Sequence, residues 1–395
     1  LKGPAAAALY GLRAANGAVV ITTKKGVAGR TQLNFRSQFS VDEVNHLPTM
    51  QNQYGQGANG IFDGTTRMSF GPRFAAGQPV YDNLDNFFRK GYSYQNFVTM
   101  SGGSEKATFF ASASNLQQTG VTPQSNYDKT SVRLSGSAQI SPKVSVTGSA
   151  QYLNSGAQRP LQGPGLFGSS GGFLLSLLNW PRNDDATNYL NPDGSRRRLL
   201  ALGNGTDNDA DNPFWSAYKN PQTDRTNRFV GNVLLSFSPV KWLTLSTNVG
   251  TDWATSRITS VRAVGTSQVN NQNGGIAETV DQNRVTTATT LATFSHSFLN
   301  EKLRGSLILG NTIEENRDEA VDYLGLIFQN PNFIGLNNTV NRGALQRDSK
   351  RHLIGNFARL STTIFDQLIV ELQGRYDQSS TLPRPDEGKV FGKGF

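Results

Sequence analysis

Apolar and polar residues alternate along most of the chain after about residue 30. In residues 31–40, Leu33, Phe35 and Phe39 share one parity, while Gln, Asn and Arg residues occupy the other. A period of two is typical of a β-strand whose two faces meet different surroundings. The pattern predicts about eleven strands, with the poorest alternation in the second and the tenth. Their expected ranges are 31–40, 94–101, 106–115, 129–140, 143–152, 226–238, 242–251, 285–299, 303–310, 352–364 and 367–376.

The connections between these strands alternate in length. The short ones are 102–105, 141–142, 239–241, 300–302 and 365–366, and the long ones are 41–93, 116–128, 153–225, 252–284 and 311–351. Tight turns on one rim and long loops on the other are the layout of an outer-membrane β-barrel. A soluble sandwich is not expected to segregate its connections in this way.

Aromatic spacing favours the same membrane wall. Phe229 and Phe237 share the apolar parity of one strand, and eight residues span about 26 Å at the usual rise. A tilt of about 40° reduces this to roughly 20 Å of height, near the apolar band of about 25 Å between aromatic girdles. Phe298, just before a short turn, is expected beside Phe237 at the periplasmic rim. The alternative is that these rings form the core of a soluble sandwich.

Composition removes several other classes of protein. The most apolar stretch, residues 171–180, is too short for a membrane-spanning helix, which needs about 20 residues. The formal net charge is +9, but the cations are scattered and the densest run, Arg196 to Arg198, lies in a predicted loop. We therefore expect no nucleic-acid partner. The chain has no cysteine, which excludes disulfides and thiolate metal sites.

The first 26 residues, LKGPAAAALYGLRAANGAVVITTKKG, differ from the rest. They predict a short Ala-rich helix, an Asn16-Gly17 turn and the strand AVVITT. A signal peptide is a poor interpretation, because the apolar run is short and Arg13 interrupts it. We expect sequence upstream of Leu1, and an odd number of strands leaves two unpaired edges, so the barrel is expected to be incomplete.

The same 26 residues closely resemble the end of the plug domain in SusC/RagA-like TonB-dependent transporters, in which an ALYG step leads through RAANG into a VITTK strand. Further similar motifs follow in the family's order: SGGSEKATFFASASNLQQTG (101–120), DNPFW (211–215), WLTLSTNVGTDW (242–253) and GRYDQSS (374–380). The resemblance implies an all-β, partial transmembrane antiparallel barrel. Residues 1–28 would end the plug, and 29–395 would form the first part of the barrel with long extracellular loops.

The resemblance also implies a function. Such proteins import large nutrients, glycans or peptides, across the outer membrane of Gram-negative bacteria. The TonB complex supplies the pull on the plug, a SusD-like surface lipoprotein covers the extracellular mouth, and outer-membrane lipid surrounds the wall. No TonB-contacting residue can be assigned in this chain. A passive porin and an outer-membrane barrel enzyme are the alternatives.

The sequence offers no catalytic constellation. His46, His296 and His352 are far apart, and neither a zinc-protease spacing nor a nucleophile elbow is present. Residues 55–60, GQGANG, match a dinucleotide-binding spacing but follow no buried strand and open no helix. We therefore expect a protein that is not an enzyme.

Two sets of loop residues are candidate binding groups. Aromatic rings beside amides and carboxylates suit the recognition of a sugar or peptide, although the rings could instead pack the loop itself. The candidate substrate-binding residues are Trp180, Tyr189, Phe214 and Trp215, with Tyr218 nearby. Asp207, Asp209 and Asp211 have the spacing of a calcium loop but lack its Gly and its bidentate Glu. The sequence thus suggests a loop calcium as its one candidate cofactor, and a solvated acidic loop is the alternative.

Overall fold

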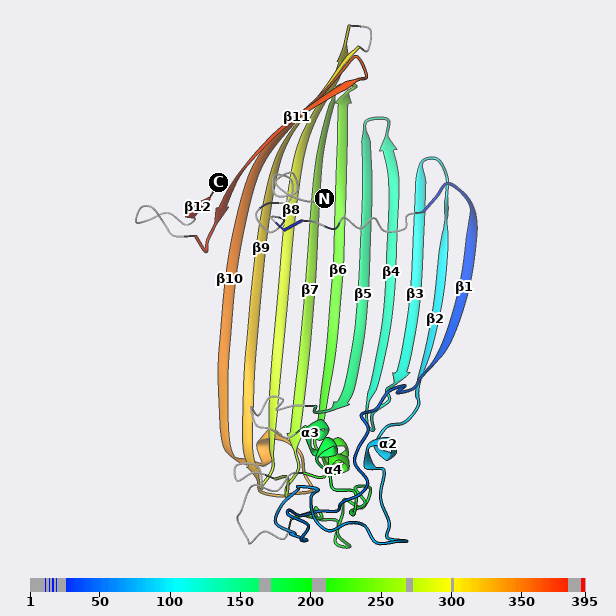
Figure 1. Cartoon of the computed structure of the whole chain (residues 1–395). Coiled ribbons are helices and arrows are strands. Elements are labelled where there is room, and N and C mark those ends of the chain that lie inside the picture. Colours follow the sequence, from blue (N-terminus) through cyan, green and yellow to red (C-terminus); the bar gives the residue numbers. More distant parts are fainter. Residues whose placement is uncertain are drawn as a thin grey trace.

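The chain forms one continuous antiparallel sheet in a computed structural model (Figure 1). The structure describes residues 11, 14, 16, 17, 19, 26–162, 172–200, 211–267, 273–299 and 302–382, together with the backbone of 392–394. Within these residues the strand order is β1 to β12 without a crossover, so each strand pairs with its neighbours in sequence. The sheet is open, because no pairing joins β1 to β11 or β12 in the described part of the chain.

All eleven predicted strands are confirmed, including the two with the poorest alternation. Their bounds are β1 Gly29–Asp42, β2 Gly91–Gly103, β3 Ala107–Thr119, β4 Asn126–Ser141, β5 Val144–Pro160, β6 Pro221–Val240, β7 Leu243–Arg262, β8 Gly275–Phe298, β9 Leu303–Phe328, β10 Thr339–Ile364 and β11 Leu368–Ser379. The short β12, Gly392–Gly394, pairs with the end of β11 and was not predicted.

The apolar residues of successive strands lie on one face of the sheet, here called the apolar face. In β6, Val233, Leu235 and Phe237 are exposed, and the residues between them are less so. Residues directly opposite each other in an antiparallel pair share a face. One such row, from β1 to β7, is Phe35, Val98, Ala113, Val132, Tyr152, Phe229 and Trp253. The strand register therefore brings the apolar positions that were predicted for each strand separately onto one continuous surface.

Three of the predicted long loops are wrong in extent. Strand β9 continues to Phe328 and β10 starts at Thr339, so the expected loop 311–351 shrinks to a connection containing the 3₁₀ turn η4, Leu336–Asn338. Likewise, the expected loops 116–128 and 252–284 reduce to 120–125 and 263–274. Only the connections 43–90 and 161–220 stay long.

The extensions have a physical cause that period-two patterns do not detect. A membrane-spanning strand needs about 9–11 residues, whereas β9 and β10 have 26 each. Away from the apolar band both faces of the sheet are polar, so alternation disappears while the backbone ladder continues. Cross-strand ion pairs support this part: Lys350 Nζ lies 3.1 Å from Glu315 Oε2, and Arg347 Nη2 lies 2.9 Å from Asp322 Oδ2. Opposite charges across strands add roughly 0.2–1 kcal/mol each.

The helices gather at the rim that carries the long connections (Figure 1). They are α2 Asn83–Phe87, α3 Phe173–Leu178 and α4 Pro213–Lys219. Among the described residues, none of the helices has the length and apolar character needed to cross a membrane. The hairpin turns lie at the opposite rim, as predicted.

Candidate functional site

The described parts of the long connections 43–90 and 161–220 pack together into what we call the rim module. Its buried core draws on all three helices and the segment between α3 and α4. The core residues are Leu84, Phe87, Phe173, Leu177, Trp180, Ala186, Phe214 and Ala217. Phe87 stacks on Phe173 at a centroid distance of 4.8 Å and meets Phe214 edge-on at 5.1 Å. The module therefore has a hydrophobic core of its own on the loop rim of the sheet.

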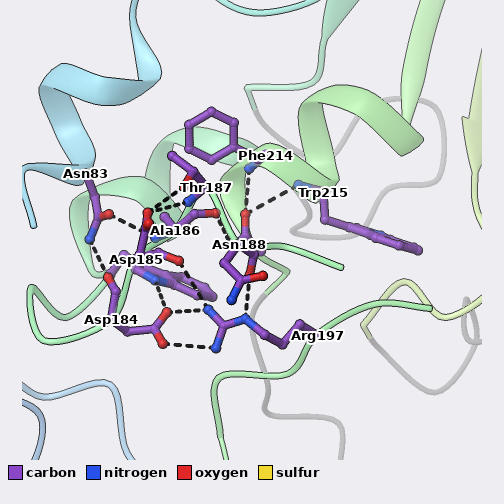
Figure 2. A network of polar contacts seen from close by, with 11 residues as sticks. Asn83, Asp184, Asp185, Ala186, Thr187, Asn188, Arg197, Phe214 and Trp215 are labelled. Carbon is purple, nitrogen blue, oxygen red and sulfur yellow. Dashed lines mark hydrogen bonds and ion pairs between the residues drawn. The ribbon is translucent and has the colours of Figure 1, made fainter. Parts of the chain in front are cut away.

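Asp184 is the polar centre of this module (Figure 2). Arg197 donates to both of its carboxylate oxygens, at 2.9 and 2.6 Å, and Trp180 Nε1 donates to Oδ2 at 2.9 Å. Asn83 Nδ2 donates to the Asp184 carbonyl at 2.9 Å, and Asn83 Oδ1 accepts from Ala186 N. A bidentate guanidinium–carboxylate pair fixes geometry as well as charge. Residues about 100 positions apart are thus locked together.

Asn212 begins α4 and ties that helix to the same network. Its Oδ1 accepts from the backbone N–H groups of Phe214 at 2.8 Å and Trp215 at 3.4 Å. Pro213 follows at the first helical position, where its missing N–H costs nothing. Asn212 Nδ2 donates to the Ala186 carbonyl at 2.7 Å. The DNPFW motif is therefore a capped helix start whose cap also bonds to the core.

Trp215 joins the rim module to the connection between β7 and β8. Its ring is 3% exposed, and Nε1 donates to Thr266 Oγ1 at 3.1 Å. Thr266 Oγ1 in turn donates to Asn220 Oδ1 at 3.0 Å. A buried indole N–H with a partner is the usual arrangement for Trp. Trp180, also 3% exposed, has the equivalent partner in Asp184, so both Trp rings pack the module rather than line its surface.

The accessible aromatic surface lies beside them. Tyr189 stacks on Tyr218 with centroids 5.7 Å apart and ring planes 11° apart, and Phe214 lies 6.5 Å from both. Tyr218 is 42% exposed, whereas Phe214 is buried. Burial, with a smaller contribution from Tyr218, raises the pKa of Tyr189, so its hydroxyl stays protonated near neutral pH. The two hydroxyl-bearing rings form a short stack, here called the tyrosine stack.

Of the three predicted calcium ligands, Asp207 and Asp209 lie outside the described residues. Asp211 is buried, and its Oδ1 accepts from Ser267 N at 2.7 Å and lies 3.4 Å from Arg196 Nη1. Burial raises the pKa of the Asp211 carboxyl, and the Arg196 guanidinium opposes that shift. A metal at this oxygen would compete with a cation already in contact with it. Among the described residues there is no group of three potential metal ligands.

Gly11, one of the described residues of the N-terminal segment, lies against the other face of the sheet, here called the polar face. In the same segment, Ala14 N donates to the Gly11 carbonyl and Gly17 N to the Ala14 carbonyl. A Cβ on Gly11 would lie 3.3 Å from Arg375 Nη2. Arg375 is almost wholly buried, donates to Asp377 at 2.7 Å, and has its guanidinium 5.4 Å from the Phe357 ring centre.

The sequence did not predict Asn83, Asp184 or Arg197 as site residues. Each stands among ordinary polar loop residues, and only the fold of the rim module brings them together. The three histidines stay apart, as expected: His46 lies in a loop, His296 in β8 and His352 in β10.

No family model matches the chain. Curated relatives do: TonB-dependent receptor P26 of Formosa agariphila is 26% identical over 400 residues, covering 96% of this chain and 38% of that protein. TonB-dependent receptor SusC of Bacteroides thetaiotaomicron is 25% identical over 287 residues, covering 66% of this chain and 26% of SusC. The chain thus spans less than half the length of these relatives.

Solved structures agree with the fold. The RagAB peptide transporter matches with a TM-score of 0.72 at 19% identity, covering 97% of this chain and 46% of that chain. The open-open state of the RagAB peptide importer matches with a TM-score of 0.73 at 18% identity, covering 100% of this chain and 46% of that chain. The sheet therefore has the fold of part of an outer-membrane barrel wall, and the chain is similar to SusC/RagA-like TonB-dependent receptors, of which it spans under half the length.

Proposed function

We propose that the protein containing this chain imports large nutrients across the outer membrane, with energy from the TonB complex and with a SusD-like lipoprotein over its extracellular mouth. The carrying observation is the polar face of the wall, where Gly11 lies against the buried Arg375. A segment that precedes the first strand and packs on the lumenal side of a barrel wall is what a plug requires. This supports the division into a plug end, residues 1–28, and a barrel part, residues 29–395.

The substrate class proposed is a peptide or a glycan, since one solved relative is a peptide transporter. The tyrosine stack is the proposed contact: Tyr218 offers an exposed ring, and Tyr189 supports it from behind. Stacked rings with hydroxyl groups can bind apolar faces and donate hydrogen bonds at their edges. Trp180 and Phe214 hold this surface in place from the core of the rim module, and Trp215 joins the module to the connection between β7 and β8. A loop calcium involving Asp207 and Asp209 stays a prediction.

Uptake in a TonB-deficient strain tests the proposal. We expect the intact protein to lose accumulation of its substrate when TonB is deleted or the proton-motive force is collapsed. Unchanged uptake in that strain would favour a passive porin. The neighbouring genes would narrow the substrate, because glycoside hydrolases indicate glycans and peptidases indicate peptides.

A further inference from the structure

Three cations stand in one row on the apolar face, beside the outer girdle aromatics. The register places Arg317 of β9 directly opposite Arg284 of β8 and Lys350 of β10. On the other side of Arg284 the same row continues to Trp253 of β7 and then Phe229 of β6. Tyr and Trp concentrate at the edges of the apolar band of a membrane wall. The cations therefore lie at the level where hydrocarbon gives way to lipid headgroups.

On the side of this row that faces the apolar band, the positive charges outnumber the negative ones. Side chains directly opposite on one face lie about 5 Å apart, and like charges at that distance destabilise the sheet. Glu315 is the acidic neighbour closer to the apolar band, and it is shared: its carboxylate lies 3.1 Å from Lys350 Nζ and 3.5 Å from Arg284 Nη2. His352 Nε2 also contacts Glu315, at 3.6 Å. One carboxylate thus serves two permanent cations.

Arg317, at the centre of the row, has unused donor capacity. It contacts Glu319 and lies 3.7 Å from Asp348 Oδ2, both farther from the apolar band. Its Nε is buried and has no hydrogen-bond partner within the part of the chain that the structure describes. Beside it, Gln282, Arg284, Arg317 and Glu319 line a hollow of about 40 Å³. This volume admits the oxygen atoms of a small polar group, since a water molecule needs roughly 10–15 Å³ by such a measure.

We propose that the row formed by Arg284, Arg317 and Lys350 binds the phosphate group of an anionic lipid in the outer leaflet. Guanidinium and ammonium groups donate charge-assisted hydrogen bonds to phosphate oxygens, and basic residues at the membrane edge attract anionic headgroups. The acyl chains would lie on the apolar residues between the girdles, with Trp253 beside the headgroup. The inference uses the proposed function only for its membrane setting.

Lipid binding by the full-length purified protein tests this site independently of transport. The probes are a phosphorylated lipid A, its dephosphorylated counterpart, and inorganic phosphate, with bound molecules counted by native mass spectrometry. We expect the phosphorylated lipid alone to bind tightly. The combined R284Q, R317Q and K350Q variant should lose roughly five-fold in affinity for each cation removed. The combined R284K and R317K variant should keep most of the binding, because the charges remain.

Arg347→Gln provides the matched control, since Arg347 lies on β10 but pairs with Asp322 on the polar face. It should bind the lipid as the unmodified protein does. Equal binding of the dephosphorylated lipid, full binding by the triple Gln variant while the barrel is assembled, or equal affinity for inorganic phosphate would each overturn the proposal. The outcome of the transport experiment does not bear on this test, because lipid binding is measured on the purified protein without transport.

Discussion

Trp180 shows at the scale of one residue how burial bears on two alternatives. The sequence allows either a substrate-binding ring or a ring that packs the loop, and the structure places the ring in the core of the rim module with its N–H on Asp184. Trp180→Ala should therefore destabilise the module by about 3–5 kcal/mol, the usual cost of truncating a buried Trp. Limited proteolysis of the assembled full-length protein should show early cleavage between α3 and α4.

Tyr218→Ala is the matched change at the surface. The ring is exposed, so its loss should leave proteolysis unchanged while weakening substrate binding by about 1 kcal/mol, roughly five-fold in affinity. If Tyr218→Ala retained full affinity for the transported substrate, the tyrosine stack would be a packing feature only.

Asn212 tests the capped start of α4. Asn212→Ala removes the acceptor for two helix N–H groups and the donor to the Ala186 carbonyl. Loss of a cap costs about 1 kcal/mol, and an unpaired buried carbonyl adds about 1–3 kcal/mol. Hydrogen exchange of the α4 amides should accelerate markedly. Asn212→Asp keeps the capping oxygen but loses the Nδ2 donor, so its exchange rate should lie between those of the unmodified protein and Asn212→Ala. Identical exchange rates in the two variants would contradict separate roles for the cap and the donor.

At the scale of the element, strand β6 tests which face meets lipid. Val233 lies on the apolar face midway between Phe229 and Phe237, and Asn232 next to it lies on the polar face. Val233→Arg should cost about 2–4 kcal/mol of folding free energy in bilayers, measured by reversible denaturant titration. Asn232→Arg should cost much less. The reverse order would mean that the two faces are assigned the wrong way round.

The strands show which parts of the fold a sequence pattern can predict. The alternation of apolar and polar residues located every long strand, because each strand contributes residues to the apolar face, as Val233, Leu235 and Phe237 do in β6. It stopped short on β9 and β10, whose ends beyond the apolar band are polar on both sides and are held together by cross-strand pairs such as Lys350 with Glu315. The site residues of the rim module were harder still. Asn83 and Asp184 are about 100 positions apart, and only tertiary packing makes them partners.

At the scale of the whole molecule, the wall has two faces with different tasks. The apolar face carries aromatic rows and the proposed lipid site, and the polar face holds Gly11 against Arg375. Gly11 has a backbone φ of +82°, a value that residues other than Gly rarely adopt. Gly11→Val should loosen this contact through backbone strain and crowding of the guanidinium. The readout is faster reaction of a cysteine introduced at Asn16 with a water-soluble reagent; an unchanged rate would contradict a fixed contact.

Conductance in planar bilayers tests the central claim, that this wall belongs to a plugged importer. The full-length protein should show little steady conductance, and deletion of the plug, including residues 1–28, should produce a large, stable pore. A full-length protein that conducts as freely as its plug-deleted form would contradict the account and identify a passive porin.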